Sequence, residues 1–253
     1  MVPDTHAHLD AEVFEQDLDA VLDRAAEAGV QRILAVGESL SSSRRVVALA
    51  RRYEMIYAAV GIHPHRAAEF ERDAEETHAL LREQKVVAVG EIGLDYSRDL
   101  VPADLQRYAF ETQLGWAHRY GVPASVHNRD ADTDVLRTVV SSGAQVILHC
   151  FSGDREFASK AVAAGCLVSF AGNVTFPKAS ALRSVIETIP DSALLVETDS
   201  PVLAPQTHRG RRNEPSYIQE IMETVASARS TDSATIGDLV RRNAETLFRW
   251  SAP

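Results

Sequence analysis

The sequence is poor in cysteine, and it lacks both a long apolar run and a basic, apolar leader. No stretch reaches the roughly 18 consecutive apolar residues of a transmembrane helix, and no segment has the pattern of a secretory signal. The two cysteines, Cys150 and Cys166, follow no metal-binding or redox spacing, so we expect reduced thiols. We therefore expect a cytoplasmic protein that does not enter a membrane.

An excess of basic residues is also absent, because the formal net charge is −10 at pH 7. This charge argues against broad, non-specific coating of a nucleic acid. It leaves room for a local basic rim beside an acidic site that holds metal ions, since bound cations reverse the local charge.

The chain of 253 residues does contain a regular alternation of short apolar segments and helical patterns. The predicted strands begin near residue 4 and then cover 32–36, 56–60, 85–91, 123–127, 145–149, 166–170 and 193–197. The predicted helices cover 13–25, 41–52, 73–84, 103–120, 130–142, 156–164, 179–189, 215–227 and 235–250. Alternation of this kind predicts a parallel sheet with right-handed crossovers, and eight units predict a (β/α)₈ TIM barrel. No linker-like segment interrupts the series, so residues 1–253 are expected to form a single domain.

The first strand carries a His-x-His pair, His6 and His8. Side chains alternate along a strand, so both imidazoles point to one side, about 7 Å apart along the strand, and can close on one metal ion. Asp4 shares this face and can form a hydrogen bond to one of the metal ligands without itself binding the metal. Two histidines without a metal at a strand end would give the same pattern. Residues elsewhere in the chain are needed to distinguish the two interpretations.

Polar residues recur where the other predicted strands end, which is where barrel enzymes place their chemistry. Glu91 is the most informative, because a carboxylate that ends an apolar strand must be paired or bind a metal. The remaining members of this set are histidines and acids: His63, His127, His149, Glu197 and Asp199. Their gathering on one rim predicts a site for two divalent metal ions.

We assign the ligands to two ions that share Glu91 as a bridge: His6, His8 and Asp199 on the first ion, and His127 and His149 on the second. A bridging carboxylate sets two ions roughly 3.5–4 Å apart, which suits clamping of the attacking and leaving oxygens. Mixed imidazole and carboxylate ligation fits Zn, Mn, Co or Fe better than Mg, although Mg²⁺ remains possible.

The chain resembles the TatD family of metal-dependent deoxyribonucleases, within the wider amidohydrolase-like barrels. The motifs behind this resemblance span nearly the whole chain: DTHAHLD at 4–10, GIHPH at 61–65, GEIGLDY at 90–96, HNR at 127–129, HCFSG at 149–153, ETDSP at 197–201 and RGRRNEP at 209–215. The resemblance implies a monomeric barrel that hydrolyses DNA phosphodiesters, often as a 3′-5′ exonuclease on single-stranded ends. It also implies the ligand assignment given above. The chain departs from the family at Val202, where an aromatic residue is usual, and at Arg211, where lysine is frequent.

Physical roles can be proposed for the acids and for His63. Asp199 can accept a proton from a metal-activated water, or it can act as a ligand alone. His63 can donate to a phosphate oxygen in the transition state, although loop polarity is an equally good explanation. Glu197 lies two residues before Asp199, on the same face, and either binds a third metal ion or holds an imidazole.

Substrate-binding residues are expected among the arginines that follow strands five and eight: Arg129, Arg209, Arg211 and Arg212. Guanidinium groups bind phosphate through two parallel hydrogen bonds, and barrel loops after strands seven and eight commonly hold phosphate. The alternative is a solvated basic loop. Asn173, after strand seven, is a weaker candidate for a substrate contact.

Other functions are compatible with parts of this pattern. An amide or lactone hydrolase of the same superfamily would commonly bridge its metals with a carbamylated lysine at the end of strand four. Glu91 occupies that place, and Lys85 is at the other end of the strand. A deacylase of mischarged tRNA is a further variant that also needs a basic rim. A metal-bound scaffold without activity is disfavoured, because the ligand set leaves positions open for water and substrate.

Overall fold

The computed structural model describes residues 2–98 and 100–250, in which eight parallel strands form one sheet in the order β1 to β8. The strands are β1 (Val2–Ala7), β2 (Val30–Val36), β3 (Ile56–Val60), β4 (Val86–Asp95), β5 (Ala124–Arg129), β6 (Val146–Leu148), β7 (Leu167–Phe170) and β8 (Leu194–Val196). They are almost wholly buried runs, as expected for parallel strands covered on both faces.

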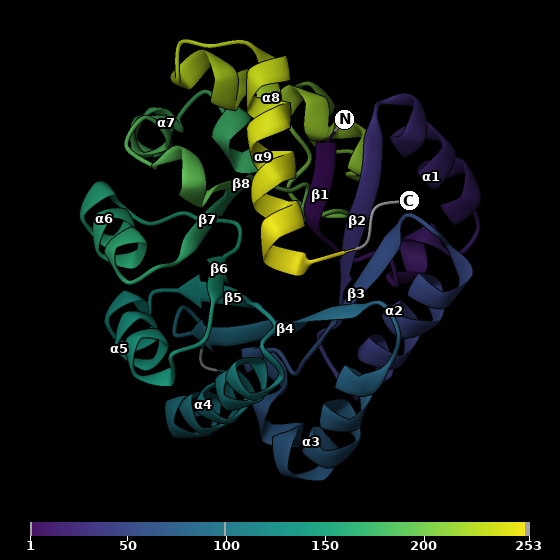
Figure 1. Cartoon of the computed structure of the whole chain (residues 1–253), viewed down its shortest axis with the longest axis vertical. Helices are drawn as coiled ribbons and strands as arrows, with labels where there is room; N and C mark the ends of the chain where they lie inside the picture. The colour runs from purple at the N-terminus through teal and green to yellow at the C-terminus, as the bar shows by residue number, and fades with distance from the viewer. Residues whose placement is uncertain (1, 99, 251–253) are drawn as a thin grey trace.

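Helices surround the strands (Figure 1). The α-helices of the described residues are α1 (Leu18–Glu27), α2 (Leu40–Arg52), α3 (Phe70–Ala79), α4 (Ala103–Tyr120), α5 (Asp132–Ser142), α6 (Arg155–Ala163), α7 (Ser180–Ile186), α8 (Ile218–Ala228) and α9 (Ser233–Phe248). Short 3₁₀ helices are η1 (Glu12–Phe14), η2 (Pro64–Glu69), η3 (Leu80–Arg82), η4 (Gly172–Thr175), η5 (Asp191–Ala193), η6 (Gln206–His208) and η7 (Pro215–Tyr217). None of the described helices is long and apolar enough to cross a bilayer. The prediction of a (β/α)₈ barrel is confirmed.

The barrel closes between β1 and the segment that follows β8. The amide of Asp199 donates to His6 O at 2.9 Å, and the amide of His8 donates to Ser200 O at 2.7 Å. The buried Asp4 carboxylate secures this seam by accepting a hydrogen bond from the Thr198 amide at 2.9 Å. Burial raises the pKa of Asp4 to about 7. Asp4 therefore fixes the strand seam, and its carboxylate has no hydrogen bond to an imidazole among the described residues, unlike the role suggested by its position in the sequence.

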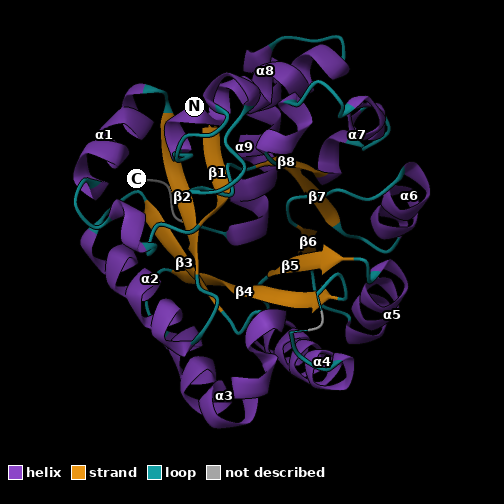
Figure 2. Cartoon of the chain, turned by 180° about the vertical axis from the view of Figure 1, so that it is seen from behind, coloured by secondary structure: helices purple, strands orange, loops and turns teal. Residues whose placement is uncertain are grey.

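The fourth strand is longer than predicted, because it continues past Glu91 to Asp95. Ile92 and Leu94 are buried, and Asp95 is paired in register with Arg129 of β5. The arrows of β4 and β5 lie side by side in Figure 2. The extra length of β4 carries Asp95 toward the rim where the strands end.

The opposite end of the barrel is covered by α9 and Trp250. Trp250, which follows α9, packs on Tyr57 with 5.2 Å between the ring centroids. The Asn243 side chain on α9 donates to Leu194 O at the start of β8. The end of the barrel where the strands finish stays open.

Candidate active site

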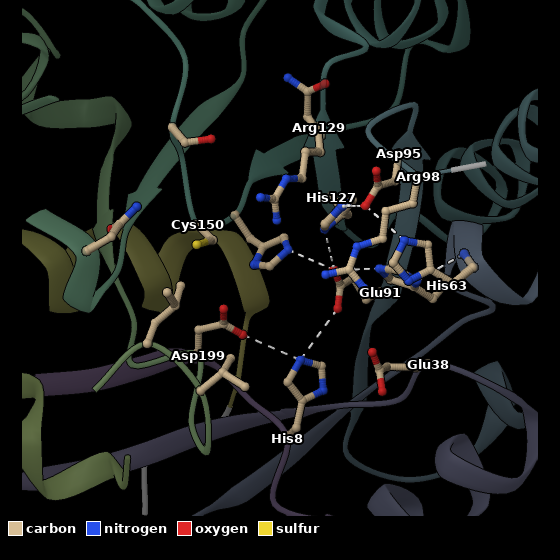
Figure 3. Close-up of a pocket in the computed structure, with 17 residues that line it drawn as sticks. His8, Glu38, His63, Glu91, Asp95, Arg98, His127, Arg129, Cys150 and Asp199 are labelled. Atoms are coloured by element: carbon tan, nitrogen blue, oxygen red, sulfur yellow. Dashed lines mark hydrogen bonds and ion pairs between the residues drawn. The ribbon is translucent and has the colours of Figure 1, made fainter. Parts of the chain in front are cut away.

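The predicted ligands meet in an open cavity of about 500 Å³ at the ends of the strands (Figure 3). The predicted residues that line it are His8, His63, Glu91, His127, Arg129, His149, Asn173 and Asp199. His6 lies beneath this lining, fully buried, and its ring stacks on His149 with 3.9 Å between centroids. The structure thus brings together all six predicted metal ligands.

Glu91 is the centre of the constellation, and its two carboxylate oxygens face different histidines. Oε2 lies 3.5 Å from Nε2 of both His6 and His8. Oε1 lies 3.0 Å from His127 Nδ1 and 2.9 Å from His149 Nε2. One carboxylate therefore lies between two separate sets of nitrogen ligands, which is the arrangement that a bridging ligand requires.

The spacing of the first pair fits a shared metal ion. Nε2 of His6 and Nε2 of His8 are 3.3 Å apart. Two nitrogens bound to one ion at about 2.1 Å with a tetrahedral angle are separated by about 3.4 Å. Ser125 Oγ lies 3.0 Å from His6 Nδ1, so the opposite nitrogen is the one directed at the ion. Asp199 completes this group, with Oδ1 at 3.5 Å from His8 Nε2.

The charges of the buried groups are strongly coupled in the metal-free protein. Burial alone would raise the pKa of Glu91, but His149 and His63 hold it well below its usual range. Burial would lower the pKa of His8, yet Asp199 and Glu91 raise it to about 10. The carboxylates are thus ionised and share protons with imidazoles, so binding of a divalent cation must displace those protons.

His63 contacts the same carboxylate with one ring nitrogen, while the other nitrogen is held by the backbone. The His65 amide donates to His63 Nδ1 at 3.1 Å, which leaves the proton of the neutral ring on Nε2. That Nε2 lies 3.3 Å from Glu91 Oε1. A protonated nitrogen cannot ligate a metal, so His63 is suited to donate a hydrogen bond.

Three residues that line the cavity hold backbone conformations that residues other than glycine rarely adopt. Asp199 has φ 55°, Leu203 has φ 53° and Cys150 has φ 44°. Such conformations cost on the order of 1–3 kcal/mol and concentrate at functional sites. At Asp199 this turn places the carboxylate beside His8 immediately after the strand seam.

Comparison with known proteins identifies the family. The family model described as TatD related DNase matches residues 3–249. The chain belongs to the TatD family. The uncharacterized metal-dependent hydrolase YabD of Bacillus subtilis is 40% identical, over 98% of this chain and 99% of that protein. A protein of Pectobacterium parmentieri named 3′-5′ ssDNA/RNA exonuclease TatD is 34% identical, over 97% of this chain and 98% of its own length.

A solved structure gives the same result. The crystal structure of YJJV, a TatD homolog from Escherichia coli K12, superposes with a TM-score of 0.95 at 32% identity, over 99% of this chain and 98% of that chain. The protein is therefore a metal-dependent hydrolase of the TatD family, and the resemblance inferred from its motifs is confirmed.

Two of the predicted ligands are held in place by acids that contact their outer nitrogens. Glu197 Oε1 lies 3.2 Å from His149 Nδ1 and accepts from the Cys150 amide at 2.6 Å. Glu197 was expected either to bind a third metal ion or to hold an imidazole, and this contact with His149 fits the second role. It directs the other ring nitrogen of His149 toward Glu91.

Asp95 performs the same task for a second ligand, and its role was not assigned from the sequence. Its Oδ2 lies 3.2 Å from His127 Nε2 and 2.8 Å from His65 Nε2. Its Oδ1 accepts from the amide and the hydroxyl of Ser97 at 3.0 and 2.6 Å. The available signal was its spacing, because Asp95 lies four residues after Glu91, on the same face of an extended strand.

Replacement of Asp95 by asparagine is expected to weaken metal binding at the His127 side by about 10–100-fold, the usual effect of losing an outer contact to a ligand. Asn removes the charge but keeps the shape of the buried Asp95. Competition with a metal indicator measures the affinities. Equal affinities in the variant and the parent protein would show that Asp95 does not position His127.

The predicted arginines separate into two groups. Among the described residues, the cavity lining includes Arg129 and Arg98, which the sequence did not single out, but no arginine from 209–212. Arg212 instead forms two hydrogen bonds to the Asp17 carboxylate at 2.7 Å and packs over Phe14. Arg212 is thus held away from the cavity by Asp17, unlike the substrate contact expected for it, and Arg211 does not line the cavity.

Proposed function

We propose that this TatD-family hydrolase cleaves phosphodiester bonds of single-stranded DNA, removing nucleotides from the 3′ end at a site for two divalent metal ions. The observation that carries the proposal is the division of Glu91 between His6 with His8 and His127 with His149. The ions, of which Mn²⁺, Zn²⁺, Co²⁺, Fe²⁺ and Mg²⁺ are candidates, supply charge that stabilises the entering and leaving oxygens. The relative named 3′-5′ ssDNA/RNA exonuclease TatD supports the substrate and polarity.

The surrounding side chains complete the reaction. Asp199, whose pKa lies below its usual value because His8 offsets the effect of burial, is ionised and can accept the proton of the attacking water. His63 carries its proton on Nε2, at the edge of the cavity, and can donate it in a hydrogen bond to a phosphate oxygen. Asn173 has a buried amide oxygen without a partner among the described residues, and it can accept from the nucleotide.

An amide or lactone hydrolase is disfavoured by Lys85. Its ammonium donates to the carbonyl oxygens of Ala50, Tyr53 and Glu54 at 2.8–2.9 Å, at the far end of β4. It cannot become a carbamate bridge between metal ions at the other end of the barrel. Glu91 holds that place, and the family match is to nucleases.

The direct test is hydrolysis of a 5′-labelled single strand in Mg²⁺ or Mn²⁺. We expect a ladder shortened from the 3′ end, with no cleavage in chelator and recovery when metal is added back. His127→Ala, purified identically, controls for a contaminating nuclease. Equal degradation by the parent and His127→Ala, or cleavage of lactones in place of DNA, would refute the proposed function.

Arg129 is expected to bind a substrate phosphate, since its guanidinium has no partner among the described residues and lines the cavity. Arg129→Ala should raise KM for DNA more than it lowers kcat. It should also reduce the salt dependence of single-strand binding by a slope of about 0.7 for the lost phosphate contact. Arg212→Ala is the matched control, because its guanidinium holds Asp17. Equal slopes in the two variants would remove Arg129 from the substrate site.

A further inference from the structure

Two hollows adjoin the metal cavity, and both share Ser152 with it. The hollow at the start of α5 is lined by Arg129 but also by three acids, Asp130, Asp132 and Asp134. A polyanionic strand would meet net negative charge there. The other hollow lies between the loops that precede α6 and α7, and its net charge is positive.

This second hollow is lined by Arg155, Lys178 and Phe176, and Asp154 is the only acid among the described residues of its lining. The Asp154 carboxylate is already used, because it accepts from the Phe157 amide at 2.8 Å and caps α6. Net positive charge here contrasts with the −10 of the whole chain. The hollow therefore attracts an anionic partner at a place that adjoins the metal ions.

Lys178 differs from the other two lysines of the chain. Lys85 is bound by three carbonyl oxygens, and Lys160 pairs with Glu156 at 2.6 Å. Lys178 is exposed and makes no ion pair or hydrogen bond with any residue in 2–98 or 100–250. An ammonium group in that state is available to a phosphate.

An aromatic ring lies beside these cations. The Phe176 ring is half-buried, and the Arg209 guanidinium lies 4.2 Å from its centre. Asn173, whose amide oxygen has no partner among the described residues, lines both the metal cavity and this hollow. A planar ring, a stacked guanidinium and flanking cations are the elements that bind successive nucleotides of a single strand.

We propose that the hollow lined by Asn173, Phe176, Lys178 and Arg155, here called the strand groove, binds the nucleotides that precede the scissile bond. The proposal rests on the proposed nuclease function and extends it to the substrate beyond the terminal nucleotide. A base stacks on the pair formed by Phe176 and Arg209, and Lys178 contacts the phosphate between bases. Arg209 thereby receives a substrate role through the groove, outside the lining of the metal cavity.

The test measures binding of a fluorescent eight-residue thymidine oligonucleotide by anisotropy in chelator, where no cleavage occurs. Lys178→Glu is compared with Lys160→Glu, which makes the same change of charge at an exposed lysine that lines neither the metal cavity nor the two hollows. We expect Lys178→Glu to weaken binding about tenfold more than Lys160→Glu and to flatten the salt slope by about 0.7. Phe176→Ala should weaken binding by about 5–100-fold through loss of one stacked base, with Phe176→Leu as a folding control.

A kinetic measurement separates this proposal from the proposed function. The ratio of kcat/KM for the octanucleotide to that for the dinucleotide should fall about tenfold in Lys178→Glu and stay unchanged in Lys160→Glu. If the parent protein cleaves no DNA but the two lysine variants still bind differently, the nuclease function fails and the strand groove stands. If the two lysine variants bind alike, the strand groove is refuted whether or not DNA is cleaved.

Discussion

Glu91→Ala should lose both metal ions and at least about a thousandfold in nuclease activity, because the ions contribute several kcal/mol to the transition state. The physical reason is that each oxygen of Glu91 faces one set of histidines, so a single truncation removes a ligand from both ions. Elemental analysis measures the metal content, and circular dichroism confirms that the barrel remains folded.

The matched control for Glu91→Ala is Glu38→Ala, which removes an exposed carboxylate from the lining of the same cavity. This variant should keep two equivalents of metal. Retention of two equivalents by Glu91→Ala as well would exclude the bridging role. Loss of one equivalent alone would assign Glu91 to a single ion.

Gly93→Ala should destabilise the barrel strongly, although it replaces none of the candidate ligands. Gly93 has φ +140°, and a Cβ added there would lie 2.0 Å from the carbonyl oxygen of His127. The pairing of β4 with β5 would have to open beside a metal ligand. We expect the free energy of unfolding to fall by about 3 kcal/mol or more, within the range of severe substitutions.

Denaturant titration of metal-free protein measures this change. Gly115→Ala in α4 is the control, because its added Cβ meets nothing within 4 Å. That substitution should be neutral or stabilise by up to about 1 kcal/mol. If Gly93→Ala were as stable as Gly115→Ala, the close approach of β4 and β5 would not constrain the site.

The gathering of the candidate metal ligands could be predicted from the sequence because each candidate follows from a local rule. His6 and His8 lie on one face because side chains alternate along a strand. Glu91 ends an apolar run, where a buried charge must be paired or bind a metal. The barrel rule then places the ends of distant strands on one rim. None of these steps required knowledge of a long-range side-chain contact.

The partners of long side chains could not be predicted in this way. The charge of the loop at 209–212 predicts a phosphate site. Arg212 instead forms a hydrogen bond to Asp17, which is 195 residues away in sequence. Arg98 enters the cavity from a loop that has no periodic pattern. Asp95 was missed for another reason, since the strand was expected to end at Glu91 and instead continues in register with β5.

The division of Glu91 between two metal ions is tested most directly by diffraction from Mn²⁺-loaded crystals at the manganese absorption edge. Two anomalous peaks are expected. One should lie within bonding distance of Glu91 Oε2 and of Nε2 of His6 and His8, and the other should lie beside Glu91 Oε1, His127 and His149. A single peak, or two peaks that do not share Glu91, would contradict the two-metal site proposed for this hydrolase.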